Sequence, residues 1–93
     1  MNSLFDVSPR WTFANDQLNA HFATGDFATG VKFINRIAAS AEEANHHPDL
    51  LLSYSFVEIT LTSHDVGHVT ERDISLARII DAHADALQIK AEA

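Results

Sequence analysis

Cysteine is absent from the 93-residue chain. Its absence excludes disulfide frameworks, thiolate zinc sites and thiol nucleophiles, and it suits the reducing cytoplasm, where we expect the protein to reside. No segment approaches the roughly 20 apolar residues that cross a bilayer, so we expect no membrane partner. The first residues also lack the basic and apolar regions of a secretory signal, and we therefore expect no secretion.

Basic residues are scarce, because six Lys and Arg stand against thirteen Asp and Glu, for a formal net charge of −7. This net negative charge would repel a phosphate backbone, and the few cations are scattered rather than clustered, so we expect no direct contact with nucleic acid. The chain also has no Gly-rich phosphate loop and no serine in a Gly-x-Ser-x-Gly setting. Nucleophilic catalysis thus has little support, which leaves acid–base chemistry or ligand binding.

The length and the hydrophobic content of 46% suffice for a single modest core. We therefore expect residues 1–93 to form one domain. A domain of this size buries little more than half of the surface of its unfolded chain, and neighbouring subunits can supply further burial. A homo-oligomer is the expectation.

Apolar periodicity and capping residues predict the secondary structure. Alternating apolar and polar positions predict two features. One is the hairpin around Asn15-Asp16, and the other is a strand with Val57, Ile59 and Leu61 on one face. The predicted elements are a hairpin over 11–22, a helix over about 26–44 capped by Asp26, a partner or edge strand at 50–53, a strand over 56–62 and a final helix that begins at the capping-box-like Thr70-Glu71-Arg72-Asp73. This order predicts an α+β fold, with one antiparallel sheet and helices on a single face.

The chain contains six histidines, at positions 21, 46, 47, 64, 68 and 83. His21 and His83 fall on polar phases of their elements, and we expect both on the solvated surface. His46 and His47 lie where Pro48 ends the first helix, and His64 lies at the end of a long strand. These two points can meet at one end of a sheet, although caps for loop backbone would explain the same histidines.

Three imidazoles with a nearby aspartate are compatible with two kinds of site. One is zinc with three protein ligands and a water. The adjacency of His46 and His47 argues against it, because side chains at i and i+1 diverge in extended backbone. The other is metal-free proton transfer, which suits imidazoles near neutral pH.

A longer pattern extends from residue 42 to residue 73: Glu42, then His46-His47-Pro48, then Tyr54, then FVEITLTSH ending at His64, then VTERD ending at Asp73. It resembles the signature of the pterin-4a-carbinolamine dehydratase family. Trp11 and the FATGDF segment are similar to the family as well. The resemblance implies a single four-stranded antiparallel sheet with helices packed on one face, in a homodimer or homotetramer.

The resemblance also implies an activity, which is loss of water from 4a-hydroxytetrahydropterin to give quinonoid dihydropterin. This reaction recycles the pterin of aromatic amino acid hydroxylases, and it needs no metal or organic cofactor. By resemblance His46 and His64 transfer protons, His47 binds and supports, Asp73 orients the site and Glu42 supports the histidine pair.

A flat pterin substrate would suggest further binding roles. Trp11 would offer a stacking surface for the pterin, although a core position in a strand explains it equally well. The main chain around Thr62 and Ser63 would read the amide edge of the pterin. Asp73 also has a second interpretation, because helix capping alone would account for it.

The chain departs from the family pattern at two positions, and a rival function remains. His68 stands where a small residue is common, and Leu50 where an aromatic residue is frequent, so both affect the expected shape of the pocket. The rival is a binding or assembly protein, because members of the family also serve as dimerisation partners of a transcription factor or assist enzyme assembly. Those members often lack part of the histidine set, whereas all three signature histidines are present here.

Overall fold

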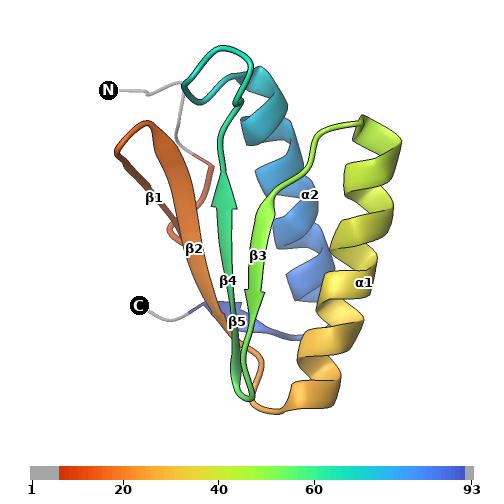
Figure 1. The fold of residues 1–93 in the computed structure, drawn as a ribbon. Helices are drawn as coiled ribbons and strands as arrows, with labels where there is room; N and C mark the ends of the chain where they lie inside the picture. Colours follow the sequence, from red (N-terminus) through yellow and green to blue (C-terminus); the bar gives the residue numbers. More distant parts are fainter. Residues whose placement is uncertain (1–6, 92–93) are drawn as a thin grey trace.

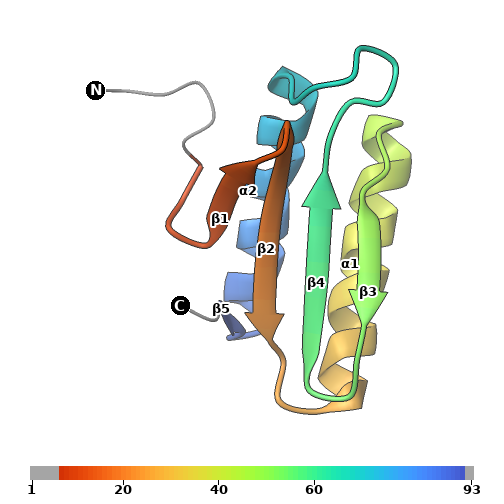
Figure 2. The same ribbon diagram turned by 60° about the vertical axis from the view of Figure 1, so that its left-hand side comes forward.

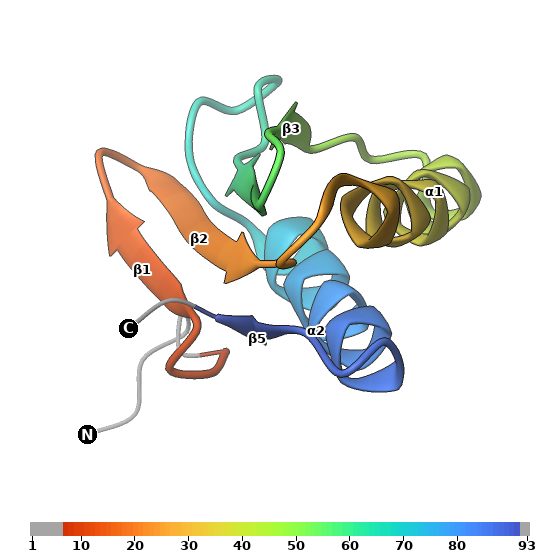
Figure 3. The same ribbon diagram turned by 90° about the horizontal axis from the view of Figure 1, so that it is seen from below.

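The computed structural model describes residues 7–91. Its elements, in chain order, are β1 (Trp11–Ala14), β2 (Gln17–Ala23), α1 (Phe27–Ala44), β3 (Asp49–Leu52), β4 (Phe56–Leu61), α2 (Glu71–Ala86) and β5 (Lys90–Ala91). Four strands form an antiparallel sheet in the order β1-β2-β4-β3, and the short β5 adds to β2. Both helices lie on one face of this sheet (Figures 1 and 3). The predicted α+β architecture is confirmed, and β5 is the one strand that the sequence did not predict.

A two-residue turn joins β1 to β2. Asn15 and Asp16 have φ angles of 54° and 60°, and two successive positive φ angles are the pattern of a type I′ hairpin turn. Asn and Asp accept this left-handed conformation more readily than other residues with a side chain. The turn sets the register in which Trp11 pairs with Ala20.

The core lies between the sheet and the helices. Alternate residues of β2 and β4 are buried, and Leu18 of β2 pairs with Leu61 of β4. The fully buried large apolar side chains are Leu18, Phe22, Phe33, Ile37, Val57, Ile59, Leu61, Leu76 and Ile80. Burial of each such side chain contributes about 1.5–3 kcal/mol, so this layer supplies the main stabilisation of the fold.

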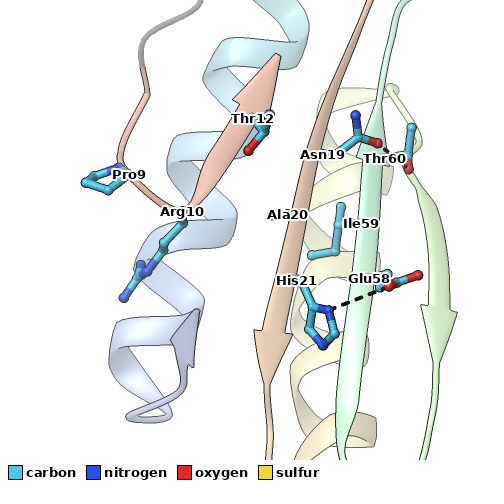
Figure 4. Close-up of a pocket in the computed structure, with 9 residues that line it drawn as sticks. All are labelled: Pro9, Arg10, Thr12, Asn19, Ala20, His21, Glu58, Ile59 and Thr60. Carbon is cyan, nitrogen blue, oxygen red and sulfur yellow. Dashed lines mark hydrogen bonds and ion pairs between the residues drawn. The ribbon is translucent and has the colours of Figure 1, made fainter. Parts of the chain in front are cut away.

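The opposite face of the sheet carries polar side chains from β2 and β4. A hollow of about 390 Å³ lies on it, lined by residues that include Asn19, His21, Glu58 and Thr60. Figure 4 shows the His21 imidazole directed at the Glu58 carboxylate, 3.6 Å away, and Thr60 beside Asn19. His21 is thus partly exposed, as the sequence predicts, with a carboxylate of the neighbouring strand as its partner.

Helix α1 begins at the predicted cap and passes very close to the edge strand. The Asp26 carboxylate accepts a hydrogen bond from the Thr29 backbone N–H at 2.7 Å, and this bond lowers the pKa of Asp26. At Gly30 an added Cβ would lie 2.6 Å from a methyl carbon of Leu52. Only a glycine lets α1 approach β3 this closely without displacing that leucine.

The two helices are joined by a hydrogen bond that the sequence did not predict. The Ser40 hydroxyl and Nε2 of His83 are 2.7 Å apart. His83 is therefore partly buried between α1 and α2 rather than solvated, because the polar phase of one helix faces a polar residue of the other. Burial is the main cause of a lowered pKa at His83, and the Arg36 charge adds to it.

No helix in the described part of the chain is long and apolar enough to cross a membrane.

Candidate active site

The end of α1 fixes the backbone of His46. Asn45 adopts a left-handed conformation with φ of 54°, which asparagine tolerates at the end of a helix. The N–H groups of Asn45 and His46 both donate to the Ala41 carbonyl, so the chain turns sharply at this point. As a result His46 is directed into the protein, where only 8% of the residue is exposed.

His46 binds a buried carboxylate. Its Nε2 lies 2.5 Å from Oδ1 of Asp73, and the two side chains are 9% and 0% exposed. Because a carboxylate accepts, Nε2–H of His46 is the donor. Asp73 belongs to the first turn of α2, so the pair joins the end of one helix to the beginning of the other.

The second oxygen of Asp73 also has partners. Oδ2 accepts from the Ser63 hydroxyl at 2.7 Å and from the Thr70 backbone N–H at 2.9 Å. The Ser63 and Thr70 hydroxyl oxygens are themselves 2.7 Å apart. The capping box predicted for Thr70 and Asp73 is thus present, and Asp73 binds His46 through its other oxygen.

His47 has a different environment. Its Nε2 lies 2.7 Å from Oε2 of Glu42, and the side chains are 54% and 77% exposed. The two adjacent imidazoles therefore bind separate carboxylates. Within residues 7–91 no group of three or more His, Cys, Asp or Glu side chains is arranged to hold a metal ion.

His64 lies on the loop after β4 and is exposed. It lines a polar cleft of about 240 Å³, together with Asn15, Asp16, Gln17, Thr62 and Gly67. His46 lines another cleft, of about 250 Å³ and mostly apolar, together with Ala44, Glu71, Arg72, Ser75, Leu76 and Ile79. The end of α1, the loop after β4 and the start of α2 all lie at the same end of the sheet (Figures 1 and 2). The two histidines share this end of the sheet, but they line different clefts.

The loop between β4 and α2 is closed onto the helix by an ion pair. The Arg72 guanidinium binds the Asp65 carboxylate at 2.8 Å, and this bond lowers the pKa of Asp65. On the other side of the loop the Thr62 hydroxyl donates to the Asp16 carbonyl at 3.0 Å. The strand end that carries His64 is thus attached both to the hairpin turn and to α2.

Trp11 contacts the core and α2. It is only 8% exposed, and its ring packs against the edge of Phe22 with centroids 6.1 Å apart. Its indole N–H donates to Asp81 at 2.8 Å, in the later half of α2. A stacking role for Trp11 stays a prediction, and this core position gives it no support.

The two departures from the family pattern also have defined positions. His68 is exposed, and its Nδ1–H donates to the Val69 carbonyl at 3.0 Å. Leu50 is partly buried and packs against the core. An exposed turn position thus accounts for His68, and a position against the core accounts for Leu50.

The Ser63 side chain is the contact that sequence reasoning missed, because only its main chain was assigned a role. The signal was present in the alternation of β4. Positions 57, 59 and 61 point inward, and continuing the same phase places Ser63 inward as well. A hydroxyl in that position requires a hydrogen-bond partner, and Asp73 provides one.

Two helices on one face of an antiparallel sheet, with a buried His–Asp pair at one end, define a small α+β protein with a site suited to proton transfer. The family model for pterin 4 alpha carbinolamine dehydratase matches residues 1–83. The chain belongs to this family.

Relatives in other organisms agree with this assignment. A candidate pterin-4-alpha-carbinolamine dehydratase of Thermosynechococcus vestitus is 44% identical over 72 residues, which cover 77% of this chain and 76% of the relative. A protein of the same name from Thermomicrobium roseum is 43% identical over 76 residues, 82% of each chain.

Solved structures show the same fold. A transcriptional coactivator/pterin dehydratase from Brucella melitensis has a TM-score of 0.79 at 33% identity, over 82% of this chain and 83% of its own. A pterin dehydratase-like protein, identified as a RuBisCO assembly factor in the alpha-carboxysome, has a TM-score of 0.66 at 29% identity, over 81% of this chain and 87% of its own.

Proposed function

We propose that this protein removes water from 4a-hydroxytetrahydropterin to give quinonoid dihydropterin. In this proposal His46 and His64, which line separate clefts at the same end of the sheet, are the proton-transfer residues. The observation that carries the proposal is the buried contact of 2.5 Å between His46 and Asp73. An imidazole held in this way has a fixed ring orientation and a fixed nitrogen that donates to the carboxylate. Such a group is suited to act as a general acid near neutral pH.

The chemistry requires two proton transfers and no further reagent. The N5 lone pair of the pterin expels the C4a hydroxyl group, and an imidazolium protonates that oxygen so that it leaves as water. A second imidazole then takes the N5 proton, which completes the quinonoid product. Each well-placed acid or base typically contributes about 100 to 10,000-fold in rate.

Several further properties belong to the same proposal. Because the imidazoles supply both transfers, no metal or organic cofactor takes part. The product would return to the pterin pool of an aromatic amino acid hydroxylase in the cytoplasm. A homodimer or homotetramer would cover apolar side chains that the single chain leaves exposed, among them Leu51 and Tyr54, which are 50% and 71% exposed.

A second candidate function is a binding or assembly role without turnover. It is favoured by the likeness to a transcriptional coactivator/pterin dehydratase and to a RuBisCO assembly factor. The buried His–Asp pair favours the dehydratase, since a protein that only binds a partner has no need to hold a proton donor in a fixed orientation.

One assay separates these functions. The carbinolamine is generated in place by a hydroxylase, and its decay is followed with and without this protein, after treatment of the protein with a chelator. We expect acceleration that survives chelation and that is lost in His46→Ala. His21→Ala is the matched control, because it removes an imidazole from the opposite face of the sheet, and it should retain full activity. Absence of acceleration by the intact protein would contradict the proposal, and acceleration that chelation abolishes would instead indicate a metal site.

A further inference from the structure

The hydroxyl of Ser63 belongs to the site although the residue is fully buried. We propose that Ser63 is a positioning residue: its hydroxyl, with Thr70 behind it, fixes the proton of His46 on Nε2, so that Nδ1 is the nitrogen that exchanges a proton with the substrate. The part that concerns the substrate rests on the proposed function. The part that concerns the ring of His46 is a property of the free protein.

The direction of the hydrogen bonds follows from counting hydrogens. The Thr70 hydroxyl oxygen accepts from the Arg72 backbone N–H at 3.3 Å. Ser63 has one hydroxyl hydrogen, and it goes to Oδ2 of Asp73. The bond of 2.7 Å between the Ser63 and Thr70 hydroxyls must therefore use the hydrogen of Thr70. A chain of donors results, from Thr70 to Ser63 to Asp73.

This series of donors determines which hydrogen bonds each oxygen of the Asp73 carboxylate accepts. Oδ2 of Asp73 accepts two hydrogens, one from the Ser63 hydroxyl and one from the Thr70 backbone N–H. An oxygen that accepts two donors has no hydrogen of its own. Oδ1 is then left to accept from His46, whose proton resides on Nε2. The neutral ring consequently has its lone pair on Nδ1, and the protonated ring has its second proton there.

Ser63 is itself held firmly. The residue is 0% exposed. Its backbone N–H donates to the His68 carbonyl at 3.2 Å, and its carbonyl accepts from the N–H groups of Val66 and Gly67. The next residue in the chain is the exposed His64. Ser63 therefore connects the strand end that carries one proposed proton-transfer residue to the carboxylate that orients the other.

The test compares Ser63→Ala with Ser63→Thr in nitrogen-15 NMR of the histidine rings and in steady-state kinetics. In the native protein and in Ser63→Thr, which keeps a hydroxyl, we expect His46 to show the Nε2–H tautomer and a slowly exchanging ring N–H. In Ser63→Ala we expect a mixture of tautomers and a loss of kcat of about tenfold with little change in KM. Thr60→Ala is the matched control, since it removes a hydroxyl bond to Asn19 on the open face and should leave the His46 spectrum unchanged.

Two results would overturn the proposal. One is an Nδ1–H tautomer of His46 in the native protein, and the other is a His46 spectrum that Ser63→Ala leaves unchanged. If Ser63→Ala does not fold, Ser63→Cys takes its place, because a thiol fills similar space but donates weakly. The NMR measurement needs no substrate, so a protein that failed to dehydrate the pterin would contradict the proposed function and still show whether Ser63 fixes the His46 ring.

Discussion

Two neighbouring histidines form the same kind of contact in opposite surroundings. His46 lies 2.5 Å from Asp73 with side chains 9% and 0% exposed, whereas His47 lies 2.7 Å from Glu42 with side chains 54% and 77% exposed. The distances differ little, but the exposures differ greatly. The left-handed turn at Asn45 directs the first imidazole inward and leaves the second at the surface.

Burial, more than distance, decides what each contact contributes. An exposed ion pair typically adds about 0–1 kcal/mol to the free energy of unfolding, because water and salt screen it. Removing one partner of a buried pair costs about 3–5 kcal/mol, because the other is left without compensation. We therefore expect His46 and Asp73 to determine the chemistry and His47 and Glu42 to adjust binding.

The largest effect is expected for Asp73→Asn. An asparagine has one acceptor oxygen, and if Ser63 and Thr70 occupy it, the amide NH2 faces His46. Nε2 of His46 must then accept, and its proton moves to Nδ1. We expect kcat to fall by about 100 to 10,000-fold in steady-state assays, as in other sites where the wrong tautomer results. Normal turnover at a lower melting temperature would instead mean that Asp73 only caps α2.

His64→Ala should have the next largest effect. We expect a loss in kcat of about 100-fold, because the proposed function makes His64 an acid or a base of the reaction. The melting temperature should change little, because the side chain is exposed. His68→Ala is the control, as it removes another exposed imidazole from the same loop. Equal rates for the two variants would show that His64 takes no part in proton transfer.

His47→Ala and Glu42→Gln should have smaller effects. We expect a rise in KM of a few fold and a change in the free energy of unfolding below about 1 kcal/mol, as is typical of an exposed pair. Added salt should reduce the difference between Glu42→Gln and the native protein, while the effect of Asp73→Asn should persist. Kinetics and urea unfolding at low and high salt provide the measurement. A loss of kcat as large as that of Asp73→Asn would remove the distinction between the two pairs.

His83 extends the comparison to an imidazole whose partner is a hydroxyl. Burial lowers its pKa below the usual 6.5, so the unfolded chain binds the proton more readily than the folded protein. Stability is therefore retained above about pH 6.5 and lost as the pH falls from there through the lower folded pKa. Melting temperatures between about pH 7.5 and pH 5 should fall less steeply for His83→Gln than for the native protein. Parallel slopes would contradict this expectation.

The fold was predictable where a short pattern determines it. Alternation at positions 57, 59 and 61 defines β4, and the spacing of Thr70 and Asp73 defines the start of α2. The two-residue β5 has no such pattern, because its pairing depends on where α2 ends rather than on its own residues. His83 was misplaced for a similar reason, since its surroundings depend on which side of α2 faces α1.

The candidate site was predictable in its residues but less so in its contacts. The spacing of the signature indicates that His46 and Asp73 belong together, and the structure gives them a direct contact. The resemblance assigned Glu42 to the histidine pair, but no spacing reveals that it is His47 that contacts Glu42, since the turn at Asn45 decides it. Trp11 illustrates the limit, because an aromatic residue in a strand has the same pattern whether it faces a ligand or the core.

If the proposed function holds, the double use of Asp73 links catalytic competence to one end of a helix. Its carboxylate accepts a hydrogen bond in the capping box and also holds the His46 ring. Opening of the first turn of α2 therefore also releases the imidazole. Local opening of a helix end requires less free energy than global unfolding. Heating should therefore abolish proton transfer before the sheet melts, and amide hydrogen exchange in the first turn of α2 should report on the fraction of molecules that are competent at any moment.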